Sequence, residues 1–148
     1  MSLLSAVRTY LAGYSGLKSG APLWVNHLGS QPTEYAIAPM PGAKVIESYI
    51  NGASLREFPF SFQSMESTAD DLERLESAGF FEAFSEWLEA QTAAGNLPTL
   101  DTGKTPVSIE ATSWGYIHEQ GRSETGIYLV QCKLTYQQEP IVSEEEEP

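Results

Sequence analysis

Cysteine is nearly absent, because the 148-residue chain contains only Cys132. A single thiol cannot form an intrachain disulfide, nor can thiols supply a four-ligand zinc site. This usage fits a reducing compartment. Long apolar runs are also missing: no window approaches the roughly 18 apolar residues of a membrane span, and the N-terminus lacks the basic start and apolar stretch of a signal peptide. The sequence therefore predicts a protein that is made and kept in the cytosol, without membrane contact.

Basic residues are scarce as well, since 8 Lys and Arg stand against 20 Asp and Glu, which gives a formal net charge of −12. Long-range electrostatics then disfavour a nonspecific grip on nucleic-acid phosphates, which argues against a DNA-binding module. Part of the acidity lies at residues 144–147, which are four consecutive glutamates. Because like charges repel there, we expect residues 139–148 to form a disordered acidic tail. Residues 1–138 are then a single α+β domain of ordinary size.

Apolar residues recur at helical spacing in two places. Residues 4–14 place their large apolar side chains on one side and predict a short amphipathic helix. A longer helix is expected over residues 68–95, where Thr68 can cap the first turn and Gly95 marks the end. Gly79 lies inside this segment and is expected to break or kink it. We expect this helical segment to be the main cover of the sheet.

Strand patterns make up most of the remaining chain. Asn51 and Gly52 form a strong turn signal, because both tolerate positive φ, and they predict a hairpin. Pro59 lacks an amide proton and argues for an edge or a bulge. The group at residues 23–25 fits either a short strand or an arm that packs elsewhere. Strands are expected at about residues 34–38, 44–50, 55–63, 106–118 and 125–137.

The order of these elements lacks the βαβ alternation of nucleotide-binding folds. It predicts an α+β fold in which a mostly antiparallel, mixed β-sheet of about five strands is packed by two or three helices. In the final strand, alternate residues from Tyr128 to Tyr136 are apolar and predict its core face. Cys132 belongs to this face, so we expect a buried, protonated and unreactive thiol.

Few residues are available for acid-base chemistry. Only two histidines are present: His27 has no Cys, Asp or Glu at ligand spacing, and His118, at a strand end beside Glu119, is expected to be an exposed polar residue. The many carboxylates between Asp70 and Glu89 recur on a predicted helix and are expected on its solvated face. Residues 103–105 end like a phosphate-binding loop, but Pro98 stands where its first glycine is needed. We therefore predict no enzymatic activity, no cofactor and no metal.

Two tryptophans and a tyrosine are instead candidates for a contact between subunits. Trp114 and Tyr116 share one face of a predicted strand, and Trp24 lies in the apolar group at residues 23–25. Aromatic side chains of this kind are enriched at protein interfaces. The candidate oligomer interface therefore consists of Trp24, Trp114 and Tyr116.

Four segments, taken together and in order, resemble a family of small phage and prophage proteins. The family is the tail terminators, also described as minor capsid or minor tail proteins. None of the segments is a chemical motif, and the acidic extension after Gln138 departs from the family pattern. The segments are LGSQPTEYAI (28–37), SAGFFEAFSEWLE (77–89), GNLPTL (95–100) and IYLVQC (127–132).

The resemblance implies a structural subunit with a tail-terminator-like fold. Such subunits form a homo-oligomeric ring, commonly a hexamer, which caps the head-proximal end of the tail tube and stops its polymerisation. The implied partners are other copies of the chain, the major tail tube protein, and head-completion or connector proteins. DNA would pass through the lumen without specific binding, and the implied location is the virion tail, with assembly in the bacterial host cytoplasm.

Two other classes of function fit parts of the sequence. An acidic immunity-type module, which covers a basic protein surface, would have a similar charge and size. A small enzyme would need a site built from Glu110, His118 and Tyr116. Oligomeric state separates the ring subunit from the immunity-type module, and a ligand-sized pocket would favour the enzyme.

Overall fold

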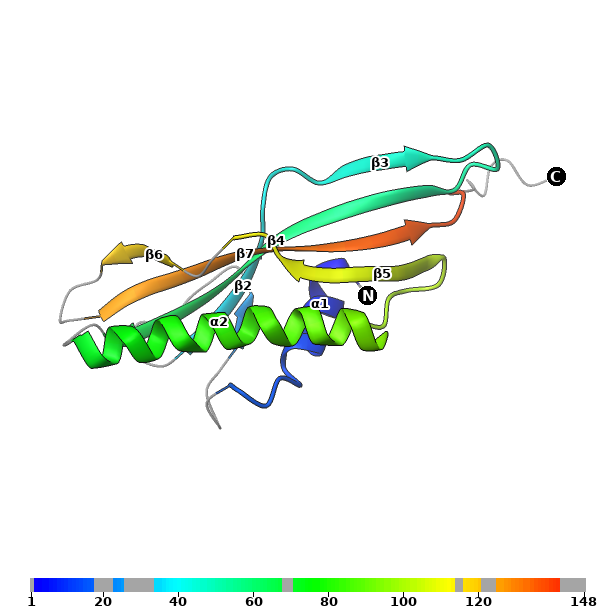
Figure 1. The fold of residues 1–148 in the computed structure, drawn as a ribbon. Helices are drawn as coiled ribbons and strands as arrows, with labels where there is room; N and C mark the ends of the chain where they lie inside the picture. The colour runs from blue at the N-terminus through cyan, green and yellow to red at the C-terminus, as the bar shows by residue number, and fades with distance from the viewer. Residues whose placement is uncertain are drawn as a thin grey trace.

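A computed structural model describes residues 2–17, 23–25, 34–67, 71–113, 116–120 and 125–141. These residues form an α+β fold, which confirms the predicted fold class (Figure 1). The described part contains seven strands where about five were expected, and two helices. In chain order the elements are α1 (Leu3–Leu11), β1 (Leu23–Val25), β2 (Glu34–Pro39), β3 (Lys44–Ser48), β4 (Ser54–Ser67), α2 (Asp71–Ala94), β5 (Lys104–Ala111), β6 (Tyr116–Gln120) and β7 (Thr125–Gln138).

All seven strands belong to one mixed sheet with the order β1-β2-β4-β7-β5. β3 also pairs with β4, on the same side as β2, and β6 also pairs with β7, on the same side as β5. The pair β1 and β2 is parallel and every other pair is antiparallel. The apolar group at residues 23–25 is therefore a strand, which settles the alternative left open by the sequence.

The centre of the sheet is the ladder between β4 and β7, which pairs every residue of the two strands from Ser54↔Gln138 to Ser67↔Thr125. Pro59 lies inside this ladder opposite Lys133, so the expected edge or bulge is wrong for that side of β4. On the other side, pairing with β3 stops at Glu57 and pairing with β2 begins at Phe60. Pro59 thus stands where the neighbour of β4 changes, and there its missing amide proton costs no ladder bond.

The two helices pack on the sheet and enclose an aromatic core. In α1, Ser2 caps the first turn by accepting a hydrogen bond from the Ser5 amide (3.0 Å), and Val7 and Leu11 are fully buried. α2 is continuous through Gly79, so the expected break is wrong. A glycine in a helix interior costs only about 1 kcal/mol relative to alanine, which the remaining turns of α2 outweigh.

The predicted core face of β7 is confirmed, since Tyr128, Val130, Cys132, Leu134 and Tyr136 are all buried. Facing residues of β4 and α2 complete the core, and the rings of Phe62 and Phe84 stack with centroids 4.5 Å apart. The core therefore lies between α2 and the middle of the sheet.

The expected strand over residues 106–118 is two strands, β5 and β6, which pair with successive parts of β7. Beyond β5 the Thr112 amide donates to the Gln131 carbonyl (2.7 Å), and the Ser113 hydroxyl accepts from the Gln131 amide (3.0 Å). A side chain thus takes the place of a backbone group in the ladder. The interruption is local, so the sequence pattern continues across it.

The proposed domain boundary at residue 138 lies close to a described contact. The Glu139 amide donates to the Gly103 carbonyl (2.8 Å), and Pro140 lies against Gly52. The first residues of the expected tail are therefore joined to the domain. Residues 142–148, which hold the glutamate run, lie outside the described residues.

Candidate functional site

Two of the three residues of the predicted oligomer interface, Trp24 and Tyr116, lie far apart in the sheet. Trp24 lies on β1 and is 43% exposed, whereas Tyr116 lies on β6, where the structure describes only the backbone. The register places them in one row of five residues, with Ala36, Gln63 and Leu129 between them. At about 4.8 Å per strand, the two backbones are about 19 Å apart on opposite edges of the sheet. Trp114 lies outside the described residues.

A different surface gathers the exposed apolar side chains. Four strand segments lie side by side at one end of the sheet. They are β3, residues 54–57 of β4, residues 135–138 of β7 and residues 104–108 of β5. We call this end, with the turn at residues 49–53, the arm; its strand β3 projects away from α2 (Figure 1). The large apolar side chains exposed in the arm are Val45, Ile46, Tyr49, Ile50 and Val107.

This gathering is specific to the arm. Among the described residues only three other large apolar side chains are exposed, namely Trp24, Val25 and Ile141. Ile141 follows β7, a strand of the arm, by three residues. Exposed apolar side chains that gather in one part of a surface often mark contacts with other molecules. The arm is therefore the strongest candidate for an interaction surface.

The turn at the tip of the arm has the predicted Asn-Gly chemistry. Gly52 has a φ of +91°, which the left-handed region allows without strain only for glycine. The Ala53 amide donates to the Asn51 side-chain oxygen (3.0 Å), and the Tyr49 amide donates to the Ala53 carbonyl (2.8 Å). The hairpin prediction is confirmed, and the turn holds Ile50 at the tip, fully exposed.

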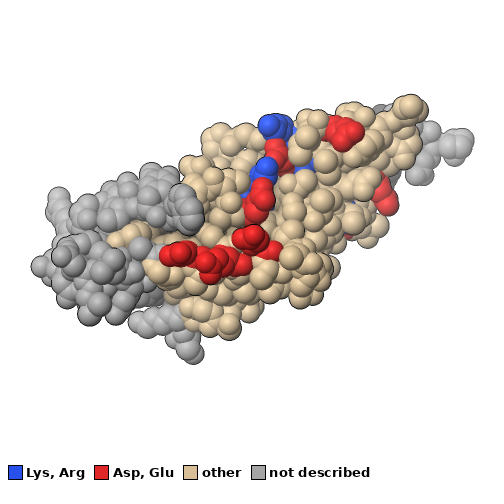
Figure 2. Space-filling view, in the orientation of Figure 1, with Lys and Arg blue, Asp and Glu red and all other residues tan. Residues whose placement is uncertain are grey.

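Charged side chains cross the sheet at the inner end of the arm. Lys133 lies 2.7 Å from Glu57 and 3.5 Å from Glu110, and Lys44 lies 3.5 Å from Glu57. Figure 2 shows these blue and red groups alternating across the face. The hydrogen bond from Lys133 lowers the pKa of Glu57, and the same bond raises the pKa of Lys133. Both groups thus stay charged at neutral pH and neutralise each other.

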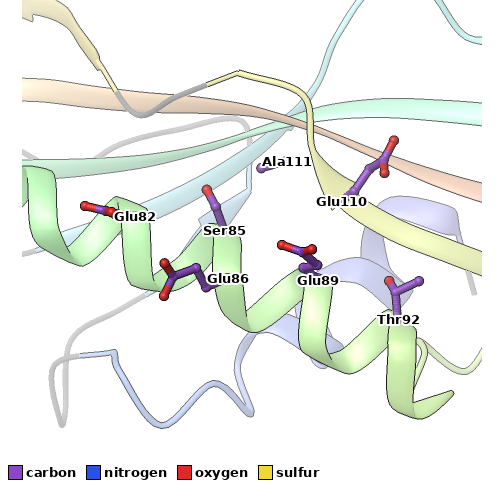
Figure 3. Close-up of a pocket in the computed structure, with 7 residues that line it drawn as sticks. All are labelled: Glu82, Ser85, Glu86, Glu89, Thr92, Glu110 and Ala111. Atoms are coloured by element: carbon purple, nitrogen blue, oxygen red, sulfur yellow. The ribbon is translucent and has the colours of Figure 1, made fainter.

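A groove of about 400 Å³ lies between α2 and β5 (Figure 3). Both of its hydroxyls are bound to backbone: Ser85 donates to the Phe81 carbonyl (3.0 Å), and Thr92 donates to the Ile109 carbonyl (2.7 Å). Among the described lining residues there is no imidazole, and both hydroxyl protons are already donated to backbone carbonyls. The lining residues are Glu82, Ser85, Glu86, Glu89, Thr92, Glu110 and Ala111.

The residues of the enzyme hypothesis are spread along β7 rather than gathered. Glu110 pairs with Lys133 and Tyr116 with Leu129, so their backbones are separated by four residues of β7, or about 13 Å. The His118 side chain is outside the described part, as is all of His27. Among the described residues, no group of three or more His, Cys, Asp and Glu is placed to hold a metal ion.

The helix glutamates that line the groove are exposed, as the solvated-face interpretation expected, and they form a row of red along α2 (Figure 2). Glu82, Glu86 and Glu89 are spaced three or four residues apart, about one helical turn, so their side chains lie on one side of α2. They make the groove acidic without forming a catalytic pair. Within the described residues, neither helix is both long and apolar enough to span a membrane.

The Cys132 side chain is 1% exposed, and burial raises the pKa of its thiol. We expect the native protein to resist thiol-specific reagents and to react fully once it is unfolded in denaturant. Replacing Cys132 with alanine removes a small buried group and should cost about 1–2 kcal/mol. Mass spectrometry after brief labelling measures the reactivity, and rapid modification of the folded protein would contradict it.

Neither protein-family models nor curated proteins match this chain. The arm lies wholly outside the segments 28–37, 77–89, 95–100 and 127–132, which carry the resemblance in the sequence.

Proposed function

We propose that this chain is a structural subunit of a phage tail: a tail terminator whose copies form a ring, a hexamer, at the head-proximal end of the tail tube. The arm is the observation that carries the proposal. A subunit whose surface apolar residues are gathered at one end of a stiff sheet is suited to assembly. Copies that pack through this end would bury side chains that a monomer leaves in water.

The charge of the chain is compatible with this role. A ring around moving DNA gains from a lumen that does not hold phosphate, and a net charge of −12 disfavours such binding. In this proposal the partners are other copies, the major tail tube protein and head-completion or connector proteins, and the ring resides in the virion tail after assembly in the host cytoplasm. The subunit contributes contacts and no catalysis.

The test mixes this protein with polymerising major tail protein from the same genome and measures tube lengths by electron microscopy. We expect short tubes of narrow length distribution, with cap density at one end. Ile50→Asp at the arm tip should raise the protein concentration needed to regulate tube length at least tenfold. Ala90→Asp, at an exposed position of α2, should leave that concentration unchanged. Unregulated tube lengths with no cap density would refute the terminator role.

The acidic groove favours a second candidate, an immunity-type module that covers a basic protein surface. Four glutamates line the groove, and complementary charge speeds the encounter with a basic partner. Such a module forms a one-to-one complex instead of a ring. Light scattering after size-exclusion chromatography, across a range of concentrations, separates the two candidates.

A further inference from the structure

The arm has two outer strands, β3 and β5, which flank β4 and β7 (Figure 1). In the described part of the chain β3 pairs only with β4, and β5 pairs only with β7. Their residues lie at the same levels of the sheet: Lys44 shares a row with Ser108, and Ser48 shares a row with Lys104. The two open edges are therefore directly opposite each other across the arm.

Both edges are irregular in the same way. The register of β3 shifts between Val45 and Glu47, so Ile46 is an extra residue, and that of β5 shifts between Pro106 and Ser108, so Val107 is extra. Each strand thus places five residues along four rows of the sheet. A regular strand does not match either edge. The two edges match each other, because each carries one additional residue over the same length.

Direction and length agree with this match. Three antiparallel pairings separate β3 from β5, so the two strands run in opposite directions. At Ile109 the Thr92 side chain donates to the carbonyl (2.7 Å) and accepts from the amide (3.1 Å), which closes the edge of β5 there. A strand added to β5 must therefore stop at Ser108. β3 begins at Lys44, whose row is that of Ser108.

We propose that β3 of one copy adds to β5 of the next copy as an antiparallel strand, with Lys44 opposite Ser108 and Ser48 opposite Lys104. The inference rests on the proposed ring and specifies its subunit contact. One-to-one pairing over the five residues places Val45 opposite Val107 and Ile46 opposite Pro106. Val45, Ile46 and Val107 are exposed by 46–48% in the single chain, and the contact packs Val45 against Val107 and Ile46 against Pro106.

The contact is head-to-tail, because each copy supplies one β3 edge and one β5 edge. A repeated contact of this kind closes into a ring when its rotation divides a full turn, and otherwise continues as a filament. Two copies that met through their β3 strands would instead form a dimer and leave β5 open.

Disulfide trapping tests the register, and the buried Cys132 leaves introduced cysteines as the reactive ones. In the double variant Val45→Cys and Val107→Cys, the paired backbones would lie about 5 Å apart, which a disulfide bridges. Mild oxidation of the concentrated protein should give a ladder of covalent oligomers up to the ring. Both positions are exposed, so circular dichroism should show an unchanged fold.

Two matched variants serve as controls. Val45→Cys alone should give no covalent dimer, and Val45→Cys with Lys104→Cys should not crosslink, because that pair is three residues out of register, or about 10 Å apart. Dimers from Val45→Cys alone would overturn the proposal in favour of two paired β3 strands. It is also overturned if the matched pair gives no ladder, whether in the concentrated protein or on tube ends.

These results are separable from the terminator role. A ladder together with unregulated tube lengths keeps this contact and removes the tail function. Regulated tube lengths without a ladder keep the tail function and remove this contact.

Discussion

Replacing Phe84 with alanine is expected to lower the free energy of unfolding by about 3–5 kcal/mol. The Phe84 side chain is fully buried, and its ring stacks on Phe62 at 4.5 Å and meets Tyr14 edge-on at 5.6 Å. It thus joins α2 to the sheet and to the residues that follow α1. Removal of the ring loses the burial of its apolar surface and also leaves a cavity, because α2 cannot move onto the sheet to fill the space.

Denaturant unfolding measures this loss, with Glu86→Ala as the control on the exposed side of the same helix. The control should change stability by less than about 0.5 kcal/mol. A loss below about 1 kcal/mol for Phe84→Ala would mean that this face of α2 lies outside the core.

Replacing Thr92 with valine is expected to cost about 2 kcal/mol, although the two side chains have nearly the same shape. The Thr92 hydroxyl binds both backbone groups of Ile109, and valine would leave that amide and that carbonyl without their partner. The same change opens the edge of β5 where the groove meets it.

Hydrogen exchange gives the sharper measurement, because the Ile109 amide should exchange faster in Thr92→Val while the amides of the β4 and β7 ladder do not. Thr92→Ser keeps the hydroxyl and should retain most of the protection. An unchanged exchange rate at Ile109 in Thr92→Val would show that the hydroxyl does not close this edge.

The helices and strands were largely predictable because burial imposes a period on the sequence. Alternation marked the core face of β7, and helical spacing marked α1 and the later part of α2. Strand order was not predictable in this way. The parallel position of β1 and the two neighbours of β4 depend on contacts between distant segments, which leave no local pattern.

The two incorrect boundaries have local causes that periodicity does not detect. The division of the strand over residues 106–118 depends on the Ser113 hydroxyl, which binds the Gln131 amide while the alternation continues on both sides. Gly79 is exposed and an added Cβ would meet nothing within 4 Å, so the helix passes through it at small cost.

The arm differs from the predicted interface because its exposed side chains are mostly aliphatic, whereas the prediction rested on aromatic residues. Val45 and Ile46 are consecutive apolar residues with Lys44 before them and Glu47 after them, and this doublet was the available signal. Such a doublet breaks the two-residue period and indicates a bulge that exposes one of its members. Trp24 and Tyr116 gave a weaker signal, since the register separates them across the full width of the sheet.

The central ladder also sets the order in which the molecule can be built. The residues paired between β4 and β7 are 58 to 84 positions apart in the chain, and contacts of such separation form slowly. Both β5 and β6 need β7 as their neighbour, so on the ribosome neither can enter the sheet before β7 has been synthesised. A nascent or truncated chain without β7 therefore has no organised β5 edge, and in the proposed ring it could not accept the β3 strand of a finished subunit.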